Sequence, residues 1–279
     1  MSFIKNIIFK IRHILMNNKT VVKIYSIVPW NDILFSVKRK IFIDKAMKKH
    51  GYIIKIKNSS IKFYLPYYNK DSIQKHIIQT RNFYELDFLN HICTIKNGIV
   101  SKAIHDGLVL DIGANIGNHT IFFLTKKARK IISFEPVKDT FDILKKNIEI
   151  NNFQNKVNLF NVGVGQTTGK AILKYYNSKN IGMSQLCSDQ NGDIPIISID
   201  ELNIDEKINF IKIDVEGFEA DVIKGMTETL KRNKPLVMIE IRDYLFAEID
   251  NILQSIGYNH ITINIDIYNI GNYLYYTQE

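Results

Sequence analysis

The residues with the clearest chemical potential form a glycine-bearing segment, Asp111 to Gly117, between a short apolar run and a helical pattern. Gly113 and Gly117 let the backbone turn tightly and approach a ligand closely, because glycine reaches backbone angles closed to other residues. In an open α/β sheet, ligands bind at the carboxyl ends of the strands, where this turn would lie. Asn115 stands where a dinucleotide-binding turn has its second glycine, so the spacing favours a smaller nucleoside ligand.

A second acidic residue, Glu135, ends the next predicted strand along the chain. A carboxylate at this place can accept hydrogen bonds from both ribose hydroxyl groups. The turn and Glu135 together therefore predict an adenosine-containing ligand rather than a turn that only connects a strand to a helix.

Two further carboxylates, Asp214 and Glu216, follow a fourth apolar run. Residues two apart on an extended backbone share a face, so both side chains can look into the same crevice. One of them can act as a general base on a substrate hydroxyl, or the pair can hold a divalent cation. A third alternative is that Glu216 only favours the start of the next helix.

Two other titratable side chains are weaker candidates for the same crevice. His119 lies in the first turn of the helix after the glycine turn, and histidine titrates near neutral pH. It is a candidate catalytic residue, with surface packing as the alternative. Glu240 ends a fifth apolar run and is also expected to line the crevice.

The elements that must position these residues alternate between strands and helices. Strands are predicted over 108–112, 130–135, 157–162, 208–214 and 236–240, with helices between them and an alternating hairpin pattern over 257–277. Such alternation indicates an α/β fold with a mostly parallel sheet, and the last pattern predicts a closing antiparallel hairpin. Residues 170–197 are longer than a simple crossover needs, which is typical of a functional loop.

Upstream, a hairpin is predicted over 52–57 and 60–65, with helices over 31–50 and 71–95. Residues 3–15 repeat apolar positions at the helical period, which predicts an amphipathic helix. This helix lies on an anionic membrane surface, or it packs on the body or on a second subunit to make a homodimer. The expected organisation is a basic N-terminal helical and hairpin extension over 1–75 and a main domain over 76–279.

Charge and composition exclude several classes of protein. The first fifty residues hold eleven Lys or Arg and two acidic residues, and the rest holds 26 of each sign, so the net charge of +9 predicts a local basic arm. Two distant cysteines give neither a disulfide framework nor a zinc signature. No apolar run approaches the roughly 20 residues that span a bilayer, and no signal peptide is evident. A cytoplasmic protein, peripheral at the membrane through residues 3–15 if that helix binds lipid, is expected.

Four stretches of the chain resemble the FkbM-type class I methyltransferases: V-L-D-I-G-A-N-I-G-N-H-T, I-S-F-E-P, I-K-I-D-V-E-G-F-E and P-L-V-M-I-E-I, within about residues 84–245. The resemblance implies a Rossmann-like, seven-stranded, mostly parallel sheet and S-adenosylmethionine as methyl donor. It also implies O-methylation of a sugar hydroxyl in a surface glycan or natural product. The cofactor contacts that it implies are Glu85, Asp111, Gly113, Asn115, Gly117, Glu135, Asn161 and Val162, with Asp214 and Glu216 facing a small-molecule or glycan acceptor.

Two other functions stay open on the sequence. The basic arm could bind RNA for a nucleic-acid methyltransferase, although the N-P-P-Y-like stretch of amine-directed enzymes is absent, because residues 213–216 read Ile-Asp-Val-Glu. Nucleic acid is therefore the less favoured partner. The chain could also be a non-catalytic cofactor-binding module tethered to a membrane assembly. A divalent metal at Asp214 and Glu216 is compatible with the sequence but is not implied by it.

Overall fold

The computed structural model describes residues 43–175, 185–266 and 268–278, and it separates two compact units, Met1–Gly51 and Tyr52–Glu279. In the first unit, residues 43–49 are helical, within the helix predicted over 31–50. The amphipathic helix predicted over 3–15 lies outside the described residues, so its contact with a membrane or a second subunit stays a prediction. No helix within the described ranges combines the length and the apolar character needed to cross a bilayer.

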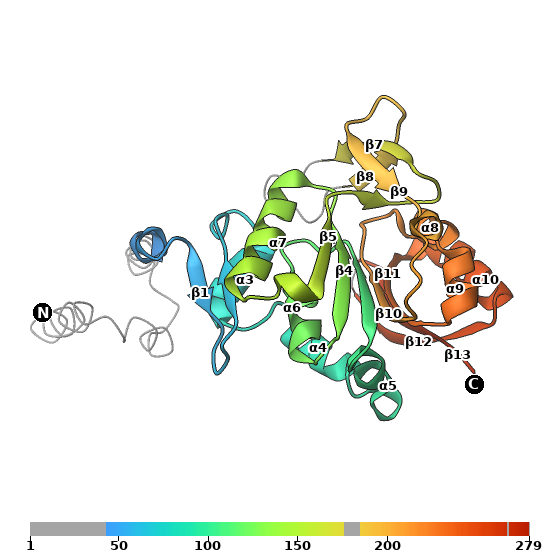
Figure 1. The fold of residues 1–279 in the computed structure, drawn as a ribbon, viewed down its shortest axis with the longest axis horizontal. Helices are drawn as coiled ribbons and strands as arrows, with labels where there is room; N and C mark the ends of the chain where they lie inside the picture. The colour runs from blue at the N-terminus through green and yellow to red at the C-terminus, as the bar shows by residue number, and fades with distance from the viewer. Residues whose placement is uncertain (1–42, 176–184, 267, 279) are drawn as a thin grey trace, which may run out of the picture. The chain divides into compact units, whose positions relative to one another are not determined.

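The second unit is built on a seven-stranded sheet with the strand order β12-β13-β11-β10-β3-β4-β5 (Figure 1). Its strands are β3 (Leu108–Ile112), β4 (Lys130–Phe134), β5 (Val157–Phe160), β10 (Ile208–Ile213), β11 (Leu236–Arg242), β12 (Tyr258–Ile265) and β13 (Ile270–Thr277). The first five run parallel, whereas β13 runs antiparallel to both β11 and β12. The Rossmann-like α/β fold and its closing hairpin are thus confirmed.

Helices cover both faces of this sheet. Successive side chains of a strand point to opposite sides, so the apolar strands present side chains for packing on both faces. One core cluster joins alternate residues of β3, namely Leu108, Leu110 and Ile112, to side chains of three helices, α8 (Glu219–Lys224), α9 (Thr227–Asn233) and α10 (Asp243–Ser255). On the other side, Phe210 of β10 packs edge-to-face against Phe123 of α6 (Asn118–Thr125), with ring centroids 5.4 Å apart. Two buried faces leave the strand ends as the places where polar groups can meet a ligand.

The predicted upstream hairpin is present and is bonded to a helix of the main domain. Strands β1 (Ile53–Lys55) and β2 (Lys62–Tyr64) pair antiparallel. The N–H groups of Lys62 and Tyr64 donate to the side-chain oxygens of Asn151 and Asn147, at 2.9 and 2.6 Å, at the end of α7 (Lys138–Ile150). The hairpin therefore packs with the sheet unit, while the domain boundary expected between residues 75 and 76 stays a prediction.

The continuous helix predicted over 71–95 is wrong, since the structure has α3 (Ser72–Thr80) and α4 (Leu86–Ile92) there, followed by α5 (Ile95–Ile104). Arg81 ends α3 in the left-handed region, with φ 57°, and its guanidinium donates to the carbonyl of Lys55 at 2.7 Å. Glu85 also has a positive φ, 55°, immediately before α4. Residues 81–85 therefore connect α3 to α4 without belonging to either helix. Glu85, at the end of this connection, is one of the predicted site residues.

The helix expected between the predicted strands over 208–214 and 236–240 is also divided, into α8 and α9. The carboxylate of Asp200, from a different part of the chain, accepts hydrogen bonds from the N–H groups of Glu228 and Thr229 in the first turn of α9. Such acceptors stabilise a helix start, because the first N–H groups of a helix lack partners within it. The second helix therefore begins where the Asp200 carboxylate accepts from its first N–H groups.

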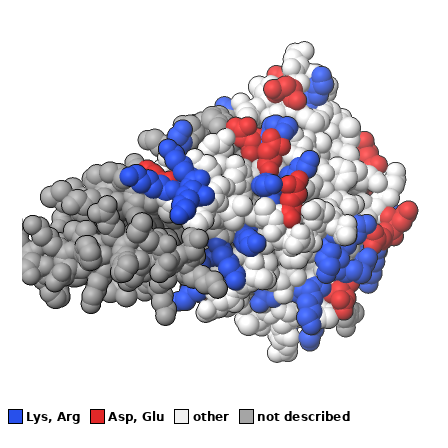
Figure 2. Space-filling model, turned by 60° about the vertical axis from the view of Figure 1, so that its left-hand side comes forward, with Lys and Arg blue, Asp and Glu red and all other residues white. Residues whose placement is uncertain are grey.

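The long excursion predicted over 170–197 is largely a small sheet. Its order is β6-β9-β7-β8, with β6 (Gly163–Val164), β7 (Gly169–Tyr175), β8 (Gln185–Ser188) and β9 (Ile194–Ile197), and residues 176–184 lie outside the described part. On the face of the molecule drawn in Figure 2, Lys and Arg side chains are interspersed with Asp and Glu. That mixture agrees with the balanced charge of the chain after residue 50.

Candidate functional site

A cavity opens at the carboxyl ends of β3 and β10, the two central neighbours of the sheet. The chain runs from β3 outward to β4 and β5, then crosses to β10 on the other side of β3. In open α/β sheets, ligands bind in the crevice that forms where the strand order changes direction in this way. The cavity is therefore the expected ligand site of the fold.

The backbone N–H groups of the glycine turn that follows β3 all donate to acceptors within the chain. Between residues 113 and 117 every N–H has an acceptor within the chain: Phe134 O for Gly113 and Ala114, Glu135 Oε2 for Asn115, Asn115 Oδ1 for Ile116, and Ala114 O for Gly117. A phosphate-binding loop works by presenting free N–H groups to its anion. This turn presents none, which agrees with the sequence-based prediction against a dinucleotide.

Gly113 is required by the close approach of two strand ends. Its φ is +77°, and a Cβ added to it would lie 1.8 Å from the carbonyl oxygen of Asp214. The N–H of Asp214 in turn donates to the carbonyl of Ile112 at 3.1 Å. Only glycine fits where the backbones after β3 and β10 meet, and this contact brings the turn beside Asp214.

Glu135 lies deep in the cavity wall at the end of β4, with a relative exposure of 6%. Its two oxygens accept from the N–H groups of Val137 and Asn115, both at 2.9 Å. Burial raises the pKa of Glu135 to about 7. Each carboxylate oxygen has two acceptor sites, so one site on each remains for the hydroxyl groups of a ligand.

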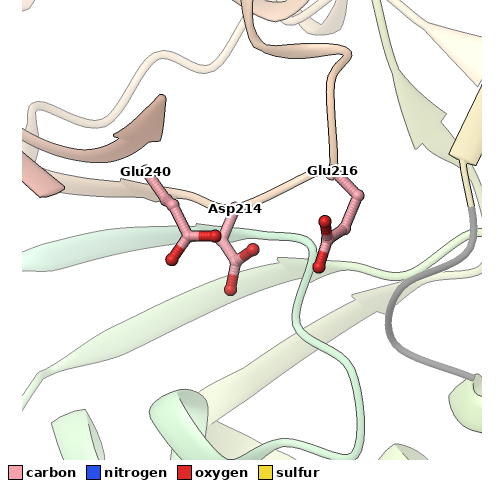
Figure 3. Close-up of side chains that lie close together, drawn as sticks. All are labelled: Asp214, Glu216 and Glu240. Atoms are coloured by element: carbon pink, nitrogen blue, oxygen red, sulfur yellow. The ribbon is translucent and has the colours of Figure 1, made fainter. Parts of the chain in front are cut away.

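Three carboxylates, Asp214, Glu216 and Glu240, converge on the cavity from β10, the loop after it, and β11 (Figure 3). One oxygen from each lies within 4.8 Å of the others. Asp214 and Glu240 meet because β10 and β11 pair in parallel register, with Ile213 opposite Ile239. Burial and neighbouring carboxylates raise the pKa of Glu240 to about 9 and that of Glu216 to about 6. Such mutual repulsion favours a ligand that brings positive charge.

Oxygen ligands of this kind are also what a divalent cation takes. Two of the three carboxylates already have a cationic partner in the chain. Arg242 Nη2 donates to Glu216 at 2.7 Å, and Lys212 Nζ lies 3.3 Å from Asp214. The metal considered for Asp214 and Glu216 stays a prediction.

Lys212 is a site residue that the sequence patterns did not identify. Its side chain is 2% exposed, and its Nζ donates to the carbonyl of Gly113 at 2.8 Å. The same ammonium lies 3.5 Å from Asp111 Oδ1. Burial alone would lower its pKa, but the carboxylates of Asp214 and Asp111 outweigh burial and hold the pKa above its usual value. A lysine between two isoleucines near the end of β10 was the available signal.

His119 lines the cavity as predicted, but in an unusual state. Burial, followed by the charge of Lys212, lowers the pKa of His119 to about 4, so the ring is neutral at pH 7. Its Nε2 is buried and has no hydrogen-bond partner among the described residues, while the ring stacks on Phe123. The neutral imidazole can hydrogen-bond a ligand, and its low pKa makes it a weak base.

The first residue of α6, Asn118, fixes the segment before α4 at the cavity. The N–H of Tyr84 donates to Asn118 Oδ1 at 2.9 Å, and Asn118 Nδ2 donates back to the carbonyl of Tyr84 at 3.1 Å. Tyr84 and Glu85 both line the cavity. The sequence resemblance pointed to Glu85, whereas the clamp that holds it was not predicted.

The structure thus brings most of the predicted site residues to one cavity. Those that line it are Glu85, Gly113, Asn115, His119, Glu135, Val162, Asp214, Glu216 and Glu240. Asp111, Gly117 and Asn161 are not among the lining residues, and their contact with a ligand stays a prediction.

Each of these three supports a residue that does line the cavity. Asp111 is fully buried and accepts from Thr120 Oγ1, beside Lys212. Gly117 caps α6 with φ +87°, and Asn161 Nδ2 donates to the carbonyl of Glu135 at 2.9 Å.

Comparison with known proteins places this geometry in one family. Residues 111–259 match the methyltransferase FkbM domain. The chain is 31% identical over 146 residues to the hexuronic acid methyltransferase AglP of Haloferax volcanii, a match that covers 51% of this chain and 59% of that protein. It is 25% identical over 181 residues to methyltransferase 1 of Beauveria bassiana, covering 55% of this chain and 72% of the relative.

Among solved structures, the chain is similar to the methyltransferase FkbM of Methylobacillus flagellatus, at 23% identity and a TM-score of 0.46, over 61% of this chain and 43% of the other. The domain match covers more than half of this chain and contains the glycine turn, Glu135 and the carboxylates of β10 and β11. The chain belongs to the methyltransferase FkbM domain family.

Proposed function

We propose that this chain transfers a methyl group from S-adenosylmethionine to a hydroxyl group of a sugar. The observation that carries the proposal is the charge of the cavity, where a turn without free N–H groups lies beside converging carboxylates. S-adenosylmethionine brings sulfonium and ammonium cations and a ribose, and it has no phosphate. The similarity to a protein named hexuronic acid methyltransferase supports a sugar as the acceptor class.

The residues of the cavity divide between donor and acceptor in this proposal. Glu135 accepts from the ribose hydroxyls through the free acceptor sites of its buried carboxylate. Glu85 and Asn115 would hold the amino-acid part of the donor, and Val162 would contact its base. Asp111, Gly117 and Asn161 contribute by holding Lys212, α6 and the Glu135 strand end in place.

When bound, S-adenosylmethionine supplies an electrophilic methyl group on a sulfonium. The chain must then orient the acceptor hydroxyl and remove its proton. Asp214, at the end of β10, is the proposed base, and Glu216 and the neutral His119 orient the acceptor by hydrogen bonds. Orientation can supply an effective molarity on the order of 10⁵ M, and a base about 10²–10⁴-fold.

Calorimetric titration of the full chain tests the donor without knowledge of the acceptor. We expect S-adenosylmethionine to bind and NAD⁺ not to bind. Glu135→Ala should weaken binding strongly, whereas Glu206→Ala, which removes an exposed carboxylate paired with Lys130 and outside the cavity lining, should not. Binding of NAD⁺, or no binding of S-adenosylmethionine to the folded wild type, would overturn the proposal.

The acceptor class is tested separately by transfer of a radiolabelled methyl group to a panel of sugar glycosides and to RNA. Label on a sugar hydroxyl is the expected result, and it should be lost in Asp214→Asn. Label on RNA alone would contradict the sugar proposal while leaving the donor assignment intact.

A further inference from the structure

We propose that Lys212 is a positioning residue, which fixes the carboxylate of Asp214 so that it faces both the sulfonium of the bound methyl donor and the acceptor hydroxyl. The inference rests on the proposed function, because it concerns how the cavity holds that donor. Its basis is a single buried ammonium group that contacts the ends of two strands and both of their carboxylates.

The ammonium of Lys212 lies close to three oxygen atoms of the chain. They are the carbonyl oxygen of Gly113 at 2.8 Å, Asp214 Oδ2 at 3.3 Å and Asp111 Oδ1 at 3.5 Å. A lysine ammonium has three donors and no acceptor; here it donates to the Gly113 carbonyl, while the two carboxylates are its ion-pair partners. The group is 2% exposed and is held by partners within the chain, which favours a positioning role over a binding role.

The position of Lys212 lets it couple two parts of the cavity. Gly113 belongs to the turn after β3, and Asp214 belongs to the end of β10. The pairing of β3 with β10 places Lys212 directly opposite Asp111, so the side chain runs beneath the turn toward the cavity. A shift of the ammonium would therefore move the turn and the Asp214 carboxylate relative to each other.

The other cation near the carboxylates does not duplicate this arrangement. Arg242 pairs with Glu216 at 2.7 Å, and its side chain is 23% exposed. Lys212, at 2% exposure, is shielded from water and from screening by salt. Asp214 itself is 34% exposed, so the lysine is the buried end of this pair.

A double-mutant cycle tests whether Lys212 acts through Asp214. Lys212→Met alone leaves the buried Asp111 carboxylate without its cation and can fail to fold. The double variant Asp111→Asn/Lys212→Met removes both buried charges and leaves Asp214, and Asp111→Asn alone is its reference. Both are compared in the wild-type and the Asp214→Asn background by calorimetric titration of S-adenosylmethionine, with thermal unfolding as the check of folding.

We expect loss of Lys212 to weaken donor binding about tenfold or more when Asp214 is present, and by less than about twofold when it is Asn. Lys130→Met, which breaks a lysine–glutamate pair with no residue in the cavity lining, should leave affinity unchanged. Equal losses in both backgrounds, or no loss in either, would overturn the positioning role while the donor still binds. If the folded wild type binds no S-adenosylmethionine, the proposed function fails first and this inference falls with it.

Discussion

Replacing Gly113 by alanine tests the close approach on which the whole cavity depends. The new Cβ would lie 1.8 Å from the carbonyl oxygen and 2.9 Å from the carbonyl carbon of Asp214, both of them backbone atoms. Real Cβ atoms do not come this close, and neither atom belongs to a flexible side chain that could move aside. The turn after β3 and the end of β10 must therefore separate.

Two costs combine in this variant. A left-handed backbone costs a residue with a Cβ about 1–2 kcal/mol relative to glycine. Forcing packed atoms apart costs a further amount of about 1–3 kcal/mol. Gly257 offers the matched control, because its φ is +90° and an added Cβ meets nothing within 4 Å. Gly257→Ala therefore carries the backbone cost alone.

Urea unfolding of the two variants separates the two costs. We expect Gly113→Ala to be less stable than Gly257→Ala by about 1–3 kcal/mol. For a domain of this size that difference lowers the unfolding temperature by about 2–4 °C per kcal/mol. Calorimetry should also show loss of S-adenosylmethionine binding in Gly113→Ala and near-normal binding in Gly257→Ala. Equal stability of the two variants, with donor binding retained in both, would refute the contact between the turn and Asp214.

Three further variants probe the supports of the cavity. Asn118→Ala leaves the N–H and carbonyl of Tyr84 without their partners, and we expect a loss of about 1–3 kcal/mol and faster amide exchange at Tyr84; unchanged exchange would argue against the clamp. Thr120→Val removes a hydrogen bond to the buried Asp111 and should cost a similar amount in urea unfolding, whereas wild-type stability would contradict that role. The pKa of Glu240 is raised to about 9, so the folded state binds its proton more tightly and wild-type stability should fall as pH rises from about 4.5 to 9. In Glu240→Gln, this contribution to the pH dependence of stability should be absent. Equal urea midpoints for the two proteins at pH 5, 7 and 9 would show that folding does not raise the pKa of Glu240.

Local patterns were sufficient for the architecture and for the positions of the main site residues. Period-two and apolar runs predicted the parallel strands and the closing hairpin, because strand formation and side-chain alternation are local properties. The glycine spacing placed the turn after β3, and the apolar runs placed Glu135 and Asp214 at the ends of their strands. All of these lie at the cavity, because parallel strands bring their carboxyl ends to one edge.

The errors fall where distant parts of the chain meet. The helix expected over 71–95 is interrupted because Arg81 bonds to Lys55 and Asn118 holds Tyr84. The pairing of the buried Asp111 with Lys212 was likewise absent from the prediction. No spacing rule within a single segment contains these contacts.

The sequence by itself determined the α/β sheet, the glycine turn and the identity of the acidic strand ends, since each depends on neighbours within a few residues. Only the tertiary structure decided the electrostatics of the cavity. Lys212 reaches the carbonyl of Gly113 across 99 residues of chain, and the β10–β11 register sets Glu240 beside Asp214. Charges interact through space rather than along the chain, so the state of each carboxylate follows from which strands the fold makes neighbours.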